Sequence, residues 1–138
     1  MASLENRKFL RANIALKVEY ESLSPPGCQG AAYSKDISVL GMNLIMPDEV
    51  ARGTRLGLRI FLDEEVPPVA AKGKIVWQRR CDYLPQSNRR YYISGIQFED
   101  MPSDDAVRAS EFVRGYLKSQ SEADIKRIIE MTENLKRS

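Results

Sequence analysis

Short segments in which apolar and polar residues alternate fill most of the chain between Ile14 and Asp100. In the first of them, IALKVEYE, residues Leu16, Val18 and Tyr20 alternate with smaller or charged neighbours, which is the period of a half-buried strand. Turn-forming residues separate these segments, and no helix-length pattern interrupts them. The sequence therefore predicts a mainly β fold, an antiparallel barrel or sandwich of about six strands.

The strand boundaries follow from the same alternation and from the positions of proline and glycine. Strands are expected at residues 14–21, 31–37, 41–46, 55–62, 69–80 and 91–100. Residues 22–30, SLSPPGCQG, hold two prolines and two glycines and are expected to form a loop. Ser38 to Gly41 is expected to be a tight connection between two strands.

The pattern changes after Pro102. Ser103 can cap a helix whose first turn carries Asp104 and Asp105, which are favourable near the positive end of the helix dipole. One apolar stripe runs along this helix, formed by Ala106, Ala109, Phe112, Val113, Tyr116 and Leu117. We expect the helix to close one end or flank of the barrel.

Residues 119–121, Ser-Gln-Ser, are expected to break this helix and to cap a second one over residues 121–137. The second helix carries a narrower stripe, formed by Ile125, Ile128, Ile129, Thr132 and Leu135. Such a helix either lies on its own barrel or pairs with a second copy as a homodimer. The expected organisation is a flexible lead-in at 1–13, a barrel at 14–102 and a helical segment at 103–138.

Composition limits the classes of protein that fit. The 138 residues, 43% of them hydrophobic, suffice for one domain. No apolar run is long enough to span a membrane, and the N-terminus lacks the apolar core of a secretory signal, so a cytoplasmic location is expected. Cys28 and Cys81 match no metal-ligand spacing and are expected to be free thiols.

Catalysis is disfavoured by the absence of histidine, the commonest general base and zinc ligand. No nucleophile signature or phosphate-binding glycine loop occurs, and the acidic runs 63–65 and 104–105 are explained by solvation and the helix dipole. The net charge of +2 is too small to indicate a nucleic-acid binder, so a single-strand-binding barrel is a weak alternative. We expect neither an enzyme nor a metal site.

Two short stretches remain. Arg7 and Arg11 lie four apart before the first strand, and the segment DISVLG, residues 36–41, follows at a strand connection. In structural terms alone, Asp36 and Ser38 can bond nearby backbone amides, and Gly41 can take a positive φ. A second R-x-x-x-R, formed by residues 55–59, is expected to lie on a strand with both arginines facing solvent, so spacing alone is weak evidence.

In order and context, the two stretches resemble the signature of the PilZ domain family, R-x-x-x-R followed by [D/N]-x-S-x-x-G. The likeness extends through KIVWQ (74–78), SGIQF (94–98) and the first helical segment, and covers about residues 5–118. It implies a six-stranded PilZ-type barrel that binds the bacterial second messenger cyclic di-GMP as its ligand, without another cofactor.

The resemblance also implies roles for individual residues. Arg7 and Arg11 would meet guanine O6 and N7 or phosphate, because a planar guanidinium matches these acceptors in pairs. Asp36 would accept hydrogen bonds from guanine N1 and N2, Ser38 would add a hydrogen bond, and Gly41 would let the backbone come close. Three further residues are weaker candidates: Lys8 and Arg79 beside phosphate, and Trp77 as a base-stacking surface, a rim or a core residue.

By the same resemblance, the lead-in folds over the ligand and creates a surface for an unidentified partner protein, with motility, exopolysaccharide or biofilm as the output. The main alternative is a PilZ-fold interaction module with weak or no ligand binding. The presence of both Arg7 and Arg11 weighs against that alternative.

Overall fold

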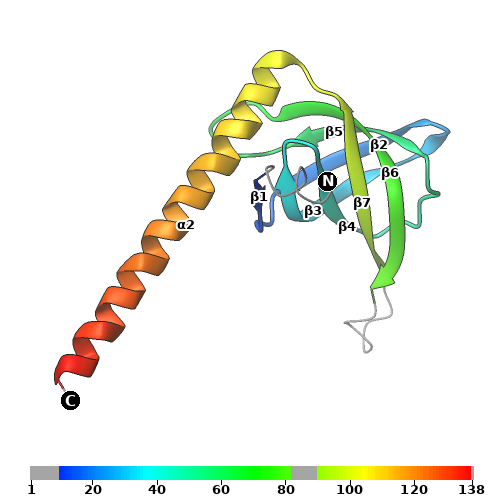
Figure 1. The fold of residues 1–138 in the computed structure, drawn as a ribbon. Helices are drawn as coiled ribbons and strands as arrows, with labels where there is room; N and C mark the ends of the chain where they lie inside the picture. Colours follow the sequence, from blue (N-terminus) through cyan, green and yellow to red (C-terminus); the bar gives the residue numbers. More distant parts are fainter. Residues whose placement is uncertain (1–9, 82–89, 138) are drawn as a thin grey trace, which may run out of the picture.

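The computed structural model describes residues 10–81 and 90–137. Within these ranges it has seven strands and one long helix (Figure 1). The strands are β1 (Arg11–Ala12), β2 (Lys17–Ser24), β3 (Pro26–Ser38), β4 (Gly41–Met46), β5 (Arg55–Ile60), β6 (Val69–Cys81) and β7 (Tyr91–Asp100). The helix, α2, spans Ser103–Arg137.

All neighbouring strands pair antiparallel. The order β3-β2-β5-β6-β7-β4 returns to its start because β4 also pairs with β3, so six strands form a closed barrel. The two-residue strand β1 adds to β3, with Arg11 opposite Ser38 and Ala12 opposite Ile37. Closure leaves only short edges exposed, and the predicted six-stranded antiparallel barrel is confirmed.

The core fills the barrel, and the first half of α2 covers it. One interior row crosses four strands as Ile37, Met42, Ile96 and Ile75, which pair in sequence and are each almost fully buried. The predicted helical stripe packs against this core, with Ala109 and Val113 buried and Phe112, Tyr116 and Leu117 partly buried. The helix contacts β6, β1 and β3, which confirms the prediction that it flanks the barrel.

Two sequence-based boundaries are wrong. Residues 22–30 are not a loop, because β2 continues to Ser24 and β3 begins at Pro26, with a tight turn at Pro25. Pro25 occupies the turn and Pro26 is the first residue of β3. Proline is tolerated at both positions because neither needs a backbone N–H group for pairing between strands. The first long strand also begins at Lys17 rather than at Ile14.

The predicted helix break is also wrong. Residues 119–121 lie inside α2, which runs without interruption for 35 residues. Serine and glutamine at exposed positions lower helix propensity only slightly, so this segment does not stop a helix that is already formed. The chain therefore has a single C-terminal helix rather than two.

The start of α2 is tied to the barrel by Arg108 and Asp105. The Arg108 guanidinium donates to the carbonyl oxygens of Pro67 and Pro68 at 2.6 and 3.1 Å, and to the Asp105 carboxylate at 2.8 Å. Asp105 also accepts a hydrogen bond from the amide of Ala70. The Arg108 hydrogen bond, followed by that of Ala70, lowers the pKa of Asp105. These bonds fix the direction in which the helix leaves the barrel.

A polar cluster of Tyr20, Cys28 and Asp48 lies at the edge of the core. The Tyr20 hydroxyl donates to Asp48 Oδ2 at 2.5 Å, and Cys28 Sγ lies 3.5 Å from the same oxygen. Burial, followed by the hydrogen bond to Asp48, raises the pKa of Tyr20 above its usual 10.0. Burial and Asp48 likewise raise the pKa of the Cys28 thiol. Both cysteines of the chain are free.

Tyr20→Phe is expected to lower the free energy of unfolding by about 1 to 2 kcal/mol, because it removes the hydroxyl that the Asp48 carboxylate accepts from. The pKa of Tyr20 is higher in the folded state, so its contribution is fully present below pH 10 and is lost as the pH rises beyond that value. Between pH 8 and pH 11, the free energy of unfolding measured in urea should therefore fall less for Tyr20→Phe than for the wild type. Equal declines would contradict this account.

Candidate functional site

Asp36 is the centre of the candidate site, although its side chain is only 7% exposed. One carboxylate oxygen forms a very short ion pair with Arg11 Nη1. The Asn43 side-chain amide donates to both oxygens, at 3.1 and 2.9 Å. Asp36 thereby holds the Arg11 guanidinium against the barrel, while 46% of the arginine side chain stays exposed to a ligand. Arg11 lies in β1, whose pairing with β3 brings it close.

Two bulges aim the site outward. Between Ser34 and Asp36 the pairing of β3 with β4 shifts by one residue, so Ser34 points into the barrel and Asp36 points out. The pairing of β6 with β7 shifts in the same way between Ile75 and Trp77. An extra residue in one strand reverses which face the following side chains occupy, and bulges of this kind commonly re-aim a functional side chain.

As a result, one continuous row crosses four strands on the outer face. Asp36 pairs with Asn43, Asn43 pairs with Gly95, and Gly95 pairs with Trp77. Directly paired residues share a face of a sheet, so the carboxylate and the indole lie on the same surface. Arg11 joins the Asp36 end of this row.

Trp77 lies on the outer surface, so the core alternative is wrong. The side chain is 40% exposed and lies over Gly95, where a Cβ would come within 2.1 Å of the indole nitrogen. The Arg79 guanidinium lies 5.8 Å from the Trp77 ring centroid, at cation–π distance. An exposed indole beside an arginine is a surface on which a planar base can stack.

Ser38 shapes the connection between β3 and β4. Its hydroxyl accepts from the Leu40 amide at 3.2 Å and lies 3.4 Å from the Gly41 carbonyl oxygen, and the residue is buried. The predicted bond from Ser38 to a nearby backbone amide is confirmed. Asp36 is also expected to accept from a nearby backbone amide, but among the described residues its hydrogen-bond donors are the side chains of Arg11 and Asn43.

The prediction of a positive φ at Gly41 is wrong. Among the described glycines only Gly27 and Gly53 have that conformation. Gly41 is required for a different reason, because a Cβ there would lie 2.1 Å from the carbonyl oxygen of Ile96 in β7. The glycine therefore allows two strand backbones to approach each other beneath the site.

Arg7 and Lys8 lie outside the described residues, so their roles stay predictions. The second R-x-x-x-R is placed as expected: Arg55 pairs with Glu99 at 3.3 Å, Arg59 pairs with Glu19 at 3.1 Å, and both arginines face solvent. They lie on β5 rather than beside Asp36.

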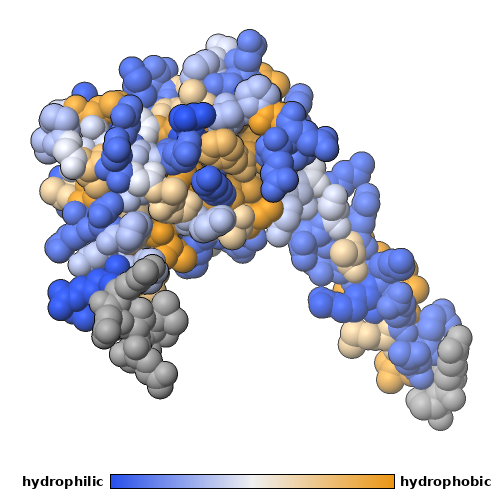
Figure 2. Space-filling model, turned by 180° about the vertical axis from the view of Figure 1, so that it is seen from behind, coloured by the Kyte–Doolittle hydropathy of each residue, from blue (hydrophilic) through white to orange (hydrophobic). Residues whose placement is uncertain are grey.

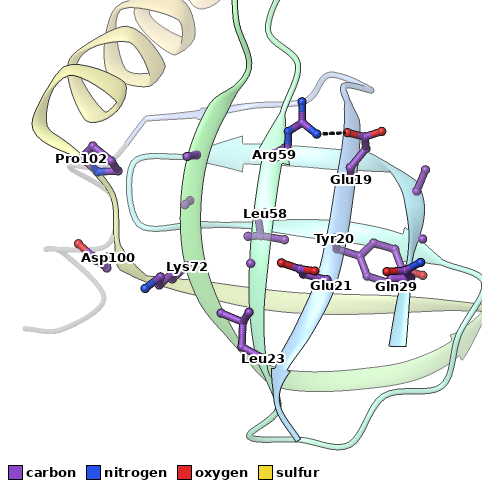
Figure 3. A pocket seen from close by; sticks show the side chains of 15 residues that line it. Glu19, Tyr20, Glu21, Leu23, Gln29, Leu58, Arg59, Lys72, Asp100 and Pro102 are labelled. Atoms are coloured by element: carbon purple, nitrogen blue, oxygen red, sulfur yellow. Dashed lines mark ion pairs between the residues drawn. The ribbon is translucent and has the colours of Figure 1, made fainter. Parts of the chain in front are cut away.

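A hollow of about 850 Å³ over β2, β3, β5 and β6 contains none of the motif residues (Figure 3). Three of its lining residues are acidic and two are basic; they are Glu19, Glu21, Asp100, Arg59 and Lys72. Figure 3 shows Arg59 paired with Glu19 at this hollow. Excess carboxylates disfavour a ligand with two phosphates, so the outer row from Arg11 to Trp77 is the better candidate.

Sequence reasoning missed Asn43 and Gly95. Asn43 is the polar residue that points outward in GMNLIM. The alternation of residues within this strand could not show that Asn43 pairs with Asp36 on the neighbouring strand. Gly95 lies in the interior of the strand segment YYISGIQFED, and a glycine at such a position is a signal of close approach by another group. In the described residues no cluster of histidine, cysteine, aspartate or glutamate could hold a metal ion.

A protein-family model described as the PilZ domain matches residues 5–115. The chain belongs to the PilZ domain family. No curated protein matches the sequence. Its structural neighbours include other PilZ-domain proteins, which agrees with the barrel described above.

Three solved structures illustrate the likeness. The Bacillus subtilis inhibitor of motility, MotI, has a TM-score of 0.64 at 17% identity, over 84% of this chain and 52% of that protein. The PilZ domain with c-di-GMP of YcgR from Escherichia coli has a TM-score of 0.62 at 11% identity, over 87% and 98%. A tetrameric PilZ domain from Xanthomonas campestris, self-assembled through a helical bundle, has a TM-score of 0.59 at 8% identity, over 83% and 91%. This PilZ chain thus spans about half the length of MotI.

Proposed function

We propose that this PilZ domain is a receptor for cyclic di-GMP that changes conformation on binding and regulates a partner protein. The observation that carries the proposal is the ion pair between Arg11 and Asp36, at one end of an outer row that ends at Trp77. The YcgR structure, which holds c-di-GMP in a PilZ domain, supports the choice of ligand.

Arg11 would bind the ligand while Asp36 positions it. The ion pair uses Nη1, so other guanidinium N–H groups remain to meet guanine O6 and N7 or a phosphate. Because both Asp36 oxygens already accept hydrogen bonds, a guanine N1 or N2 donor would have to use a remaining lone pair or displace Arg11. We therefore give Asp36 the positioning role first and the direct guanine contact second.

Ser38 and Gly41 would act mainly by shaping the turn that presents Asp36, since the hydroxyl is buried and the glycine faces β7. At the other end of the row, a guanine would stack on Trp77, and Arg79 would meet phosphate or the exposed face of the base. Arg7 and Lys8 would complete the anion contacts.

The domain would act as an adaptor and not as an enzyme. Residues 11–12 of the expected lead-in already pair with β3, so binding would fold only the part that precedes β1 over the ligand and create a surface for an unidentified partner in the cytoplasm. Motility, exopolysaccharide or biofilm control is the proposed output, in line with the names of relatives such as the inhibitor of motility. No described helix is long and apolar enough to cross a membrane.

A second candidate function is a PilZ-fold interaction module with weak or no ligand binding. The observation in its favour is an apolar surface on the outer face, where Tyr33 pairs with Ile45 and the two are 59% and 37% exposed. An exposed tyrosine and isoleucine on the same outer face as Trp77 also suit a protein partner.

Calorimetric titration of the wild type with cyclic di-GMP, GTP and cyclic di-AMP separates the two functions. We expect saturable binding of cyclic di-GMP, at least about tenfold tighter than that of the others, because two guanines and two phosphates meet the same row. The only tryptophan is Trp77, so its fluorescence should change on saturation. Absence of cyclic di-GMP binding would leave the interaction module as the better reading.

A further inference from the structure

Asn43 lies in the middle of the outer row, between Asp36 on β3 and Gly95 on β7. Its side-chain nitrogen lies 3.1 and 2.9 Å from the two carboxylate oxygens of Asp36. A carboxylate that pairs with an arginine can only accept hydrogen bonds, so the amide nitrogen of Asn43 must face Asp36. This leaves the amide oxygen, Oδ1, on the side of the group away from the carboxylate.

The Oδ1 atom of Asn43 is open to a ligand. It accepts no hydrogen bond among the described residues. In the same part of the chain no buried side-chain nitrogen or oxygen lacks a partner, so this oxygen is exposed to solvent. The neighbour of Asn43 on β7 is Gly95, which has no side chain to cover it. Figure 2 shows the second half of α2 projecting away from the barrel, so that half of the helix leaves the row uncovered.

The other exposed side chains at the row can only donate hydrogen bonds. Arg11, Arg79 and the Trp77 indole carry N–H groups and no acceptor. Such donors suit phosphate oxygens and the O6 and N7 atoms of guanine, but they cannot accept from a base. Asp36 could accept, but its side chain is only 7% exposed and both of its oxygens already do so. Asn43 Oδ1 is therefore the exposed side-chain acceptor that the described part of the row offers to a base.

We propose that Asn43 determines the specificity of this site for guanine, by accepting a hydrogen bond from the guanine N2 amino group at Oδ1. The inference rests on the proposed binding of cyclic di-GMP and adds a contact outside the two motifs. In guanine, O6 and N2 lie at opposite ends of the edge that pairs with cytosine. A base whose O6 meets Arg11 therefore directs N2 along the row, past Asp36 and toward Asn43.

This contact would select by the loss that a wrong base suffers. Hypoxanthine has the O6 and N7 atoms of guanine but lacks the N2 amino group, so it would leave Asn43 Oδ1 without a partner once the ligand excludes water. A site built to hydrogen-bond a group of its ligand rejects an analogue that lacks the group, because a buried polar atom is left unpaired. Adenine, which also lacks this amino group, would be rejected in the same way.

Calorimetric titration with cyclic di-GMP and cyclic di-IMP, in which hypoxanthine replaces guanine, isolates the N2 amino group. We expect the wild type to bind cyclic di-GMP about tenfold tighter than cyclic di-IMP. Asn43→Lys keeps a donor for Asp36 but has no acceptor, so the two affinities should then agree within about twofold. Gln29→Ala, the matched control, removes an exposed amide of β3 that lies outside the row, and should keep the tenfold preference.

Asn43→Ala separates recognition of the base from anchoring of Asp36. It removes both the donor and the acceptor, so it should weaken binding of cyclic di-GMP and also abolish the preference over cyclic di-IMP. Circular dichroism would verify that each variant keeps its strands.

The outcomes distinguish this inference from the receptor function. If Asn43 only anchors Asp36, Asn43→Ala would weaken both ligands by the same factor; a tenfold ratio kept by Asn43→Ala or Asn43→Lys would overturn the inference. A wild type that binds both ligands equally would also overturn it, while the receptor function would stand. A wild type that binds neither ligand would overturn the proposed function and the inference with it.

Discussion

Replacing Arg11 with alanine is expected to weaken cyclic di-GMP binding by about 100-fold or more, corresponding to roughly 3 kcal/mol. The substitution removes charge-assisted hydrogen bonds to the ligand and also the cation that neutralises the buried Asp36 carboxylate. Without that cation, the carboxylate repels the ligand's phosphates from the centre of the site. Calorimetric titration of the variant against the wild type measures the effect.

Two further variants separate charge from geometry. Arg11→Lys keeps the positive charge but loses the planar fork, so it should recover less than a tenth of the lost affinity if paired hydrogen bonds dominate. Asp36→Ala should also weaken binding, because it frees the Arg11 side chain from its anchor. Arg7→Ala is expected to act in the same direction as Arg11→Ala.

Arg59→Ala is the matched control, since it removes an arginine with the same motif spacing whose ion pair with Glu19 is exposed to solvent. Its effect on affinity should stay within about twofold. Undiminished binding by Arg11→Ala, or an equal loss in Arg59→Ala, would contradict the assignment of the site.

The strands and the motif could be predicted because their signals are local in the sequence. Alternating residues mark β4 and β7, and the segment from Asp36 to Gly41 marks the connection next to the site. The bulges after Ser34 and before Trp77 could not be predicted, because an extra residue becomes visible only when the partner strand is known. For this reason the sequence left the position of Trp77 open between surface and core.

The errors in the elements have a related cause. The prolines at residues 25 and 26 indicate a loop, but the pairing of β2 with β3 on either side of a tight turn outweighs that local signal. In α2, residues 119–121 look like a helix cap, but the turns on both sides already supply the hydrogen bonds that a cap would replace. Local sequence preference is therefore a poor guide where the neighbouring structure already supplies hydrogen-bond partners for the backbone.

Gly41→Ala is expected to lower the free energy of unfolding by about 3 kcal/mol or more. The added methyl group would lie 2.1 Å from the Ile96 carbonyl oxygen, which belongs to a backbone and cannot rotate away. The strands β4 and β7 would have to separate at the point where Gly41 pairs with Gln97. Urea unfolding of the variant and the wild type measures the loss.

Gly115→Ala is the matched control, because that glycine lies in α2 with no atom within 4 Å of an added Cβ. It should raise the free energy of unfolding by about 0.5 to 1 kcal/mol, since alanine is the better helix former. A Gly41→Ala variant as stable as the wild type would contradict this prediction, because it would show that β4 and β7 can move apart without a loss of stability.

The same variant separates two roles for the motif glycine. If Gly41 serves only ligand approach, Gly41→Ala should fold normally and lose affinity. The contact with Ile96 instead predicts that stability falls first and that affinity, measured at a temperature where the variant is folded, falls as the turn through Ser38 is displaced. The glycine would then belong to the motif because the Asp36 turn depends on close strand packing, and ligand binding would depend on it through that turn.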